Sequence, residues 1–187
     1  MNKHLKALSV VLSLAIFGLV GYSFYQNRAT ADSAGGADRA ALTLGDAVPD
    51  FEAKTISGKG LQLAQFKGKP VILNFWASWC GPCIEEMPSL IKLVKTFPND
   101  IELIAISGDS NMADIDSFLK SFPEMRTVPN IHVIFDEDKS LTQKYGIYRL
   151  PESFVLGKDQ KVAKKISGTI DWNTPDALEY MKKLSAP

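Results

Sequence analysis

The chain has two cysteines, Cys80 and Cys83, and only two residues separate them. They follow an apolar run at residues 71–76 that is typical of a buried strand, and they precede apolar residues that recur at helical spacing. Pro82 lies where a proline suits the first turn of a helix. The sequence therefore predicts a Cys-x-x-Cys pair at the junction between a buried strand and the N-terminus of a helix.

This placement has a direct consequence for the reactivity of the two thiols. A helix N-terminus presents unpaired backbone N–H groups and a partial positive charge, which stabilise a thiolate more than a thiol. We therefore expect Cys80 to be the nucleophile and a more buried Cys83 to resolve the mixed disulfide. A structural disulfide is the alternative, but a bridge that closes so short a loop gains little unfolded-state entropy.

A zinc site would be a different use of the same thiols. Tetrahedral zinc needs four ligands, and beyond the cysteines the chain offers only His132, because His4 lies in the N-terminal flank. His132 falls within an apolar run and is expected to be an ordinary strand residue. We therefore expect no metal, and no cofactor other than a redox-active Cys80–Cys83 disulfide.

The N-terminus predicts export. Lys3 and Lys6 precede an uncharged stretch at residues 7–25, which as a helix would reach roughly 28 Å, close to the ~30 Å of a hydrocarbon core. The stretch is either an uncleaved signal anchor or a signal peptide cleaved near the small residues 29–31. In both cases the positive flank stays in the cytoplasm and the rest of the chain becomes extracytoplasmic, on the periplasmic side.

Composition divides the chain into three parts. Residues 1–28 form the anchor or signal peptide, and residues 29–44, rich in Ala, Gly, Ser and Asp, form a flexible linker. Residues 45–187 form one globular domain. The whole chain carries 21 basic and 21 acidic residues, a balance that gives no indication of nucleic acid binding.

The pattern within the globular domain predicts an α/β fold with a mixed sheet. Buried strands are expected at residues 71–76, 101–106 and 133–135, with helices between them and after them. Residues 48–51 and 60–63 are expected to pair in a first hairpin, and residues 153–156 and 162–166 in a closing hairpin. A last helix is expected at about residues 174–184, with Thr174 or Asn173 as its cap.

Three motifs together show a resemblance to a known family. They are WASWCGPC at residues 76–83, EMP at residues 86–88 and YGIYRLPESF at residues 145–154. With them, residues 44–184 resemble the thioredoxin superfamily, and most of all its membrane-anchored extracytoplasmic branch related to TlpA, ResA and CcmG. The resemblance implies a thioredoxin-like fold with an added N-terminal β-hairpin and a helix-strand insertion before Pro151.

The resemblance also implies roles for individual residues. Pro151 matches the family's cis-proline, which leaves adjacent backbone free to pair with a substrate. Asn74 stands where thioredoxins carry a buried Asp and cannot take a proton, whereas the resembling branch has a Glu at the place of Glu86. Because Glu86 follows Cys83 by three residues on the same helix face, we assign it to proton transfer. Trp79 and Leu150 are the candidates for an apolar docking surface.

The function implied is that of an extracytoplasmic thiol–disulfide oxidoreductase that reduces disulfides of exported proteins. The resemblance suggests substrates in cytochrome c maturation or copper-site assembly, such as an apocytochrome c, and a membrane thiol transporter as electron donor. Three alternatives stay open, namely a disulfide-donating oxidant, a Sco-like copper-delivery protein and a thiol peroxidase. The last is disfavoured because peroxidases of this fold carry Thr or Ser three residues before the nucleophile, where this chain has Ala77.

Overall fold

The structure is a computed structural model that describes residues 19, 22–23 and 42–186. The predicted anchor or signal peptide and the predicted linker therefore lie outside the described residues, apart from residues 19, 22–23 and 42–44. Among the described residues, no helix combines the length and the apolar character needed to cross a membrane.

A five-stranded mixed sheet forms the centre of residues 42–186, in the order β5-β4-β3-β6-β7. Three parallel neighbours, β3 (Val71–Trp76), β4 (Glu102–Ser107) and β5 (Ile131–Phe135), make up one side of the sheet. The strands β6 (Glu152–Leu156) and β7 (Val162–Ser167) continue it in antiparallel pairing. This arrangement confirms the predicted α/β class with a mixed sheet.

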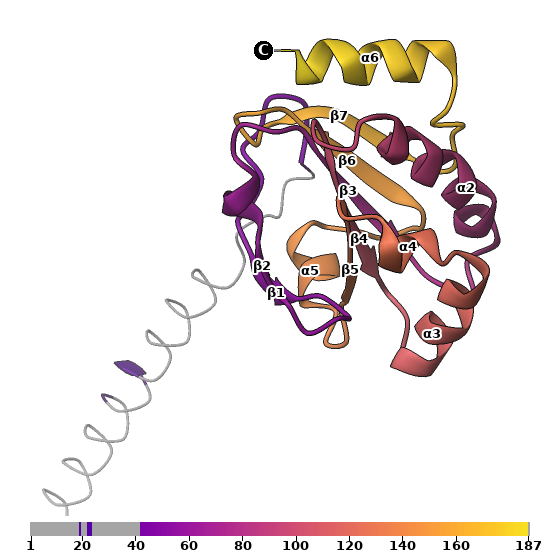
Figure 1. The fold of residues 1–187 in the computed structure, drawn as a ribbon. Coiled ribbons are helices and arrows are strands. Elements are labelled where there is room, and N and C mark those ends of the chain that lie inside the picture. Colours follow the sequence, from indigo (N-terminus) through magenta and orange to yellow (C-terminus); the bar gives the residue numbers. More distant parts are fainter. Residues whose placement is uncertain (1–18, 20–21, 24–41, 187) are drawn as a thin grey trace, which may run out of the picture. The chain divides into compact units, whose positions relative to one another are not determined.

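Helices cover both faces of this sheet (Figure 1). One face carries α2 (Gly81–Thr96), α3 (Met112–Ser121) and the short α4 (Glu124–Thr127). The opposite face is covered by α5 (Ser140–Lys144) and by the hairpin described next. Cys80 ends the connection from β3 to α2 and Cys83 lies in the first turn of α2, so the site lies at the carboxyl end of the central strand.

The first hairpin pairs β1 (Glu52–Lys54) with β2 (Gly60–Gln62), with Glu52 opposite Gln62. The hairpin was predicted, but its first strand begins later than the predicted residues 48–51. The physical reason is that the Asp50 carboxylate accepts hydrogen bonds from the N–H groups of Phe51 and Ala64, at 2.9 Å and 3.1 Å. These bonds engage residue 50 outside the pairing of the hairpin. After β2 the chain enters a 3₁₀ helix, η1 (Leu63–Phe66), that the sequence pattern did not reveal.

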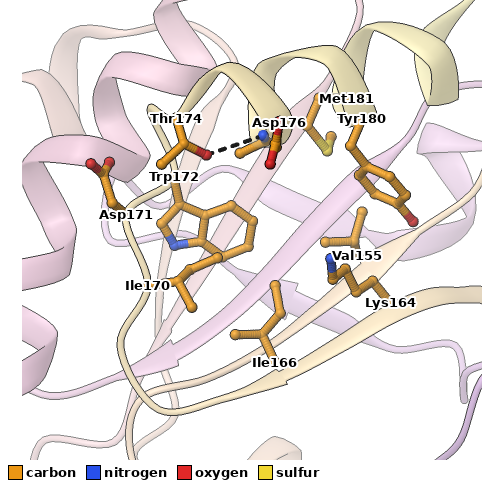
Figure 2. Close-up of a pocket in the computed structure, with 11 residues that line it drawn as sticks. Val155, Lys164, Ile166, Ile170, Asp171, Trp172, Thr174, Asp176, Tyr180 and Met181 are labelled. Atoms are coloured by element: carbon orange, nitrogen blue, oxygen red, sulfur yellow. Dashed lines mark hydrogen bonds between the residues drawn. The ribbon is translucent and has the colours of Figure 1, made fainter.

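The last helix, α6 (Pro175–Ser185), lies on the same face of the sheet as α2 and adds Met181 to its core. Thr174 caps it by accepting the N–H of Ala177 at 3.2 Å, as predicted. A cavity of about 460 Å³ separates this helix from β6 and β7 (Figure 2). Trp172, Ile166 and Tyr180 are among the mainly apolar side chains that line it.

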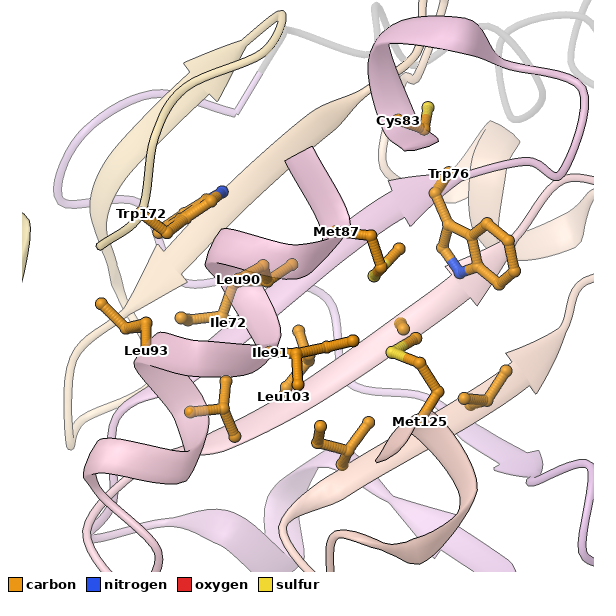
Figure 3. Packing of buried hydrophobic residues seen from close by; sticks show 14 of the residues in the cluster. Ile72, Trp76, Cys83, Met87, Leu90, Ile91, Leu93, Leu103, Met125 and Trp172 are labelled. Carbon is orange, nitrogen blue, oxygen red and sulfur yellow. The ribbon is translucent and has the colours of Figure 1, made fainter. Parts of the chain in front are cut away.

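The core consists of two clusters, one on each face of the sheet. Alternation along β3 assigns Ile72 and Trp76 to the α2 side, and Leu73 and Phe75 to the hairpin side. The α2 face of the first cluster is formed by Met87, Leu90, Ile91, Leu93 and Val94, several of which Figure 3 shows beside the strands. The strands and helices that define the site are therefore fixed by a buried apolar layer on each side of the sheet.

Candidate active site

Cys80 and Cys83 are joined by a disulfide at the N-terminus of α2, with 5.2 Å between their Cα atoms. Cys80 is the N-cap residue, and its sulfur accepts the backbone N–H of Cys83 at 3.3 Å. Both residues are buried, and Cys83 more so than Cys80. The N–H group and the dipole of a helix that extends to Thr96 both favour a thiolate at Cys80 over a thiol.

A buried carboxylate, Asp109, holds the segment that leads into the disulfide. Its Oδ1 accepts the Ser78 hydroxyl at 2.6 Å, and its Oδ2 accepts both the Ser78 backbone N–H at 3.0 Å and the Ser107 hydroxyl at 2.6 Å. The Gly108 N–H also donates to the Trp76 carbonyl at 2.7 Å. The end of β4 thereby fixes the residues that connect β3 to the nucleophile.

Glu86 is buried one helical turn after Cys83, with 2% of its surface exposed, whereas Glu85 points outward to solvent. One carboxylate oxygen, Oε1, accepts the indole N–H of Trp172. The other oxygen, Oε2, is buried without a hydrogen-bond partner among the described residues. Burial raises the pKa of Glu86 to about 7, against the opposing effect of the Trp172 hydrogen bond. This group can therefore exchange a proton near neutral pH.

A groove of about 580 Å³ opens beside Cys80. Its rim includes Trp79, which is 68% exposed, and Tyr148, which is 87% exposed. The remaining lining residues are Cys80, Gly81, Pro82, Gly108, Lys139, Thr142, Ile147, Arg149 and Leu150. The structure thus brings both predicted docking residues, Trp79 and Leu150, to one groove with the nucleophile.

The Leu150–Pro151 peptide bond is cis, and Pro151 is buried at the start of β6. The next residue, Glu152, is also buried, but Lys165 pairs with its carboxylate at 2.9 Å and the Ser167 hydroxyl donates to it at 3.2 Å. This second carboxylate is therefore neutralised by a cation of β7, whereas for Glu86 the described part of the chain supplies no cation at hydrogen-bonding distance.

Other predicted residues lie in the core or away from the groove. Trp76 is fully buried, with its ring 4.5 Å from that of Phe118, and Asn74 donates from its buried amide to the Ser153 hydroxyl at 2.9 Å. His132 lies on β5, where its Nε2 is 3.0 Å from a Glu102 carboxylate oxygen. Among the residues that the structure describes, no cluster of three or more His, Cys, Asp or Glu side chains could hold a metal ion.

Two residues of the site, Asp109 and Trp172, were not predicted from the sequence. Asp109 lies 31 residues from Ser78, and Trp172 lies 86 residues from Glu86, so neither contact has a local signature. The acidic residue at the end of a strand and the tryptophan before the last helix were present in the sequence, but only the folded chain brings them to the site.

A disulfide at a helix N-terminus, a groove beside it and a buried carboxyl group one turn further define a thioredoxin-fold thiol–disulfide oxidoreductase. The comparisons agree with this class. The chain is 32% identical to the thiol-disulfide oxidoreductase ResA of Bacillus thuringiensis subsp. konkukian, over 99% of both chains. By its match over residues 44–165, the chain belongs to the AhpC/TSA family.

Solved structures give the same result. The chain is similar to a Chlorobium tepidum protein assigned as the thiol:disulfide interchange protein DsbE, with a TM-score of 0.61 and 28% identity over 76% of this chain and 95% of that one. It is also similar to the exposed lipoprotein thioredoxin Etrx1 of Streptococcus pneumoniae, with a TM-score of 0.59 and 29% identity over 73% of this chain and 100% of that one. The thioredoxin-like fold and the exchange chemistry are thereby established.

Proposed function

We propose that this oxidoreductase works as a reductant of disulfides in exported proteins, on the extracytoplasmic side of the membrane. The observation that carries the proposal is the combination of the Cys80–Cys83 pair with the buried carboxyl group of Glu86. Similarity to ResA and to a lipoprotein described as exposed supports the location. The uncharged residues 7–25 behind a basic flank support it independently.

In the proposed reaction the reduced Cys80 thiolate attacks one sulfur of the substrate disulfide. A Cys80–substrate disulfide forms, and the other substrate sulfur leaves as a thiolate that takes up a proton. Cys83 then transfers its proton to Glu86 and attacks the Cys80 sulfur. The Cys80–Cys83 bond forms as the Cys80–substrate bond breaks, and the second substrate sulfur leaves as a thiolate that takes up the proton held by Glu86. The substrate has then gained two electrons and two protons, one proton from solvent and one that came from Cys83.

Glu86 suits the second step because of its position and its pKa. It shares a helix face with Cys83, and a pKa of about 7 lets it accept a proton near neutral pH and release it afterwards. Cys83 is buried, so bulk water is a poor acceptor for its proton. A carboxyl group next to it provides the missing base.

The groove beside Cys80 is the proposed docking surface. Trp79 and Leu150 offer apolar contacts on its two sides, and the backbone next to Pro151 is proposed to pair with the extended chain around the substrate cysteines. Substrates of this kind include an apocytochrome c and a protein that assembles a copper site. No soluble cofactor takes part, so a membrane thiol transporter is proposed to return electrons to the oxidised pair.

The first experiment uses the reduced full-length protein and two oxidised peptides. One peptide carries Cys-Ala-Ala-Cys-His, the type of sequence to which haem c is attached, and the other carries Cys-x-x-x-Cys as in copper-assembly factors. We expect the unchanged protein to reduce both disulfides, and the ratio of the two rates shows which type of peptide it prefers. The Cys83→Ser protein should stop at the mixed disulfide. Oxidation of both reduced peptides by the oxidised protein, with neither oxidised peptide reduced, would make the chain a disulfide donor.

The location is tested separately in intact cells. A membrane-impermeant thiol reagent should label Cys80 of the full-length protein after mild reduction and without permeabilisation. Labelling that needs permeabilisation would place the domain on the cytoplasmic side and contradict the proposal.

A further inference from the structure

The segment between β7 and α6 lies against the first turns of α2. At one end the Thr169 hydroxyl donates to the Pro82 carbonyl at 3.2 Å. At the other end the Trp172 backbone N–H donates to the Ser89 hydroxyl at 3.1 Å, and this hydroxyl in turn donates to the Glu86 carbonyl at 2.9 Å. Trp172 is therefore fixed to α2 through its backbone before its side chain is considered.

The side chain of Trp172 makes a second attachment to the same turn. Its indole N–H donates to Oε1 of Glu86, and only 2% of the residue is exposed. One wall of the indole lines the cavity below α6 (Figure 2), while the ring nitrogen faces α2. Because the backbone of Trp172 is held at Ser89 and its side chain is buried, the indole has little freedom to move and is a rigid support for one carboxylate oxygen.

The two oxygens of Glu86 are consequently unequal. Oε1 is occupied by a donor that cannot accept a proton in return, because an indole N–H only donates. Oε2 is buried and has no partner among the described residues. A buried oxygen without a partner costs stability, which is typical of a group kept for a reaction.

We propose that Trp172 is a positioning residue for the exchange reaction: its indole N–H holds Oε1 of Glu86 and so keeps Oε2 for the proton of Cys83. The inference rests on the proposed role of Glu86 in the resolving step. The donated bond stabilises the carboxylate form of Glu86, so the same contact that orients the base also keeps it ionised.

Neighbouring charged groups do not account for the same effect. The charged residues that line the cavity beside Trp172 are Asp171, Asp176 and Lys164, and all three are exposed. The Glu152–Lys165 pair lies on the opposite face of the sheet, where Lys165 packs over Phe154. None of these side chains is hydrogen-bonded to Glu86. Cys80 and Cys83 do not titrate while they are joined in the disulfide.

A first test needs no change at Trp172. In the oxidised full-length protein, the indole N–H resonances of the three tryptophans can be followed by NMR as the pH is varied. We expect the Trp172 resonance to shift with a midpoint near pH 7, where Glu86 ionises, and to lose this titration in Glu86→Gln protein. The exposed Trp79 serves as the internal reference. A Trp172 indole N–H chemical shift that does not change as Glu86 ionises would overturn the inference.

A second test follows the rate of the resolving step against pH. Trp172→Phe keeps an aromatic ring but removes the hydrogen bond that stabilises the Glu86 carboxylate. The part of the profile in which the rate of the resolving step rises with pH (the rising limb) should therefore move to higher pH by roughly one unit, and the rate at neutral pH should fall several-fold. The rates should converge at alkaline pH. Tyr180→Phe is the matched control, because it removes one hydrogen bond, to the Ala163 carbonyl, from the same cavity wall. Its profile should coincide with that of the unchanged protein.

The outcomes separate this inference from the proposed function. If Glu86→Gln removes the rising limb and Trp172→Phe leaves it in place, Glu86 is the base but Trp172 does not position it. If Glu86→Gln leaves the profile unchanged, the proposed role of Glu86 fails first. If Trp172→Phe shifts the limb only when Glu86 is present, both stand.

Discussion

Glu86 destabilises the oxidised protein at any pH at which it is ionised, because its charge is buried and no cation of residues 42–186 pairs with it. Its pKa is about 7 when folded and 4.5 in its reference state, so the native protein binds more protons between these values. Stability must therefore fall as pH rises through this window. We expect Glu86→Gln to change little at about pH 4 and to raise the free energy of unfolding by up to about 3 kcal/mol at about pH 8.

The measurement is denaturant unfolding of the oxidised protein at both pH values. Glu85→Gln is the matched control, since Glu85 is an exposed carboxylate on the adjacent position of the same helix. It should give no pH-dependent difference. A Glu86→Gln protein that gains as much stability at about pH 4 as at about pH 8 would show that the carboxyl group is not ionising in this window.

The two cysteines should behave differently when each is replaced. Cys80 accepts the N–H of Cys83 and lines the groove, whereas Cys83 is shielded beneath it. With an oxidised Cys-x-x-Cys peptide, Cys83→Ser protein should accumulate one mixed disulfide per chain and Cys80→Ser protein should form almost none. Intact-protein mass spectrometry gives both yields. A higher yield for Cys80→Ser would exchange the two roles.

Sequence spacing located Cys80, Cys83 and Glu86 because they follow one another at intervals of three residues at the start of one helix. Residues at i and i+3 of a helix are neighbours on its surface. The same reasoning could not reach Trp172 or Asp109, whose contacts join distant parts of the chain. Such contacts depend on the packing of α6 and β4 against α2, and no local pattern encodes them.

The junction between β3 and α2 depends on β4 through Asp109. Replacing Asp109 by Ala leaves the Ser78 N–H and two hydroxyl groups without their acceptor in a mostly buried place. We expect a loss of about 3 kcal/mol in the free energy of unfolding, because hydrogen bonds to a buried charge are lost together. Exchange should also slow, since the segment carrying Trp79 and Cys80 is no longer fixed.

Urea unfolding of the oxidised protein measures this loss. Asp100→Ala is the control at an exposed carboxylate after α2, and it should change stability by less than about 0.5 kcal/mol. An equally small effect of Asp109→Ala would mean that the loop holds its shape without the carboxylate.

Elements with strong periodicity were predicted well. The strand at residues 71–76 was located to the residue, and α6 lies within one residue of its predicted bounds. The short elements η1 and α4 were missed because four residues are too few to establish a period. The early start assigned to the first hairpin strand was wrong because the Asp50 carboxylate bonds to the N–H of Ala64, a contact that the sequence does not show.

The domain as a whole places one redox pair where the central strand ends, between two apolar cores and beside an open groove. A dithiol–disulfide pair can serve a reductant or an oxidant, since such pairs have reduction potentials from about −270 mV in thioredoxin to about −120 mV in DsbA. The direction of electron flow is therefore set by the balance between thiolate stabilisation at Cys80 and the stability of the disulfide. This balance is a property of the complete protein.

The equilibrium reduction potential of the Cys80–Cys83 pair tests the central claim most directly. It can be obtained for the full-length protein in glutathione or dithiothreitol buffers, from the fluorescence of Trp76 and Trp79 next to the pair. A reductant recharged by a membrane donor should have a value near or below about −220 mV. A value near about −120 mV, typical of a strong oxidant, would contradict the claim and make the protein a disulfide donor.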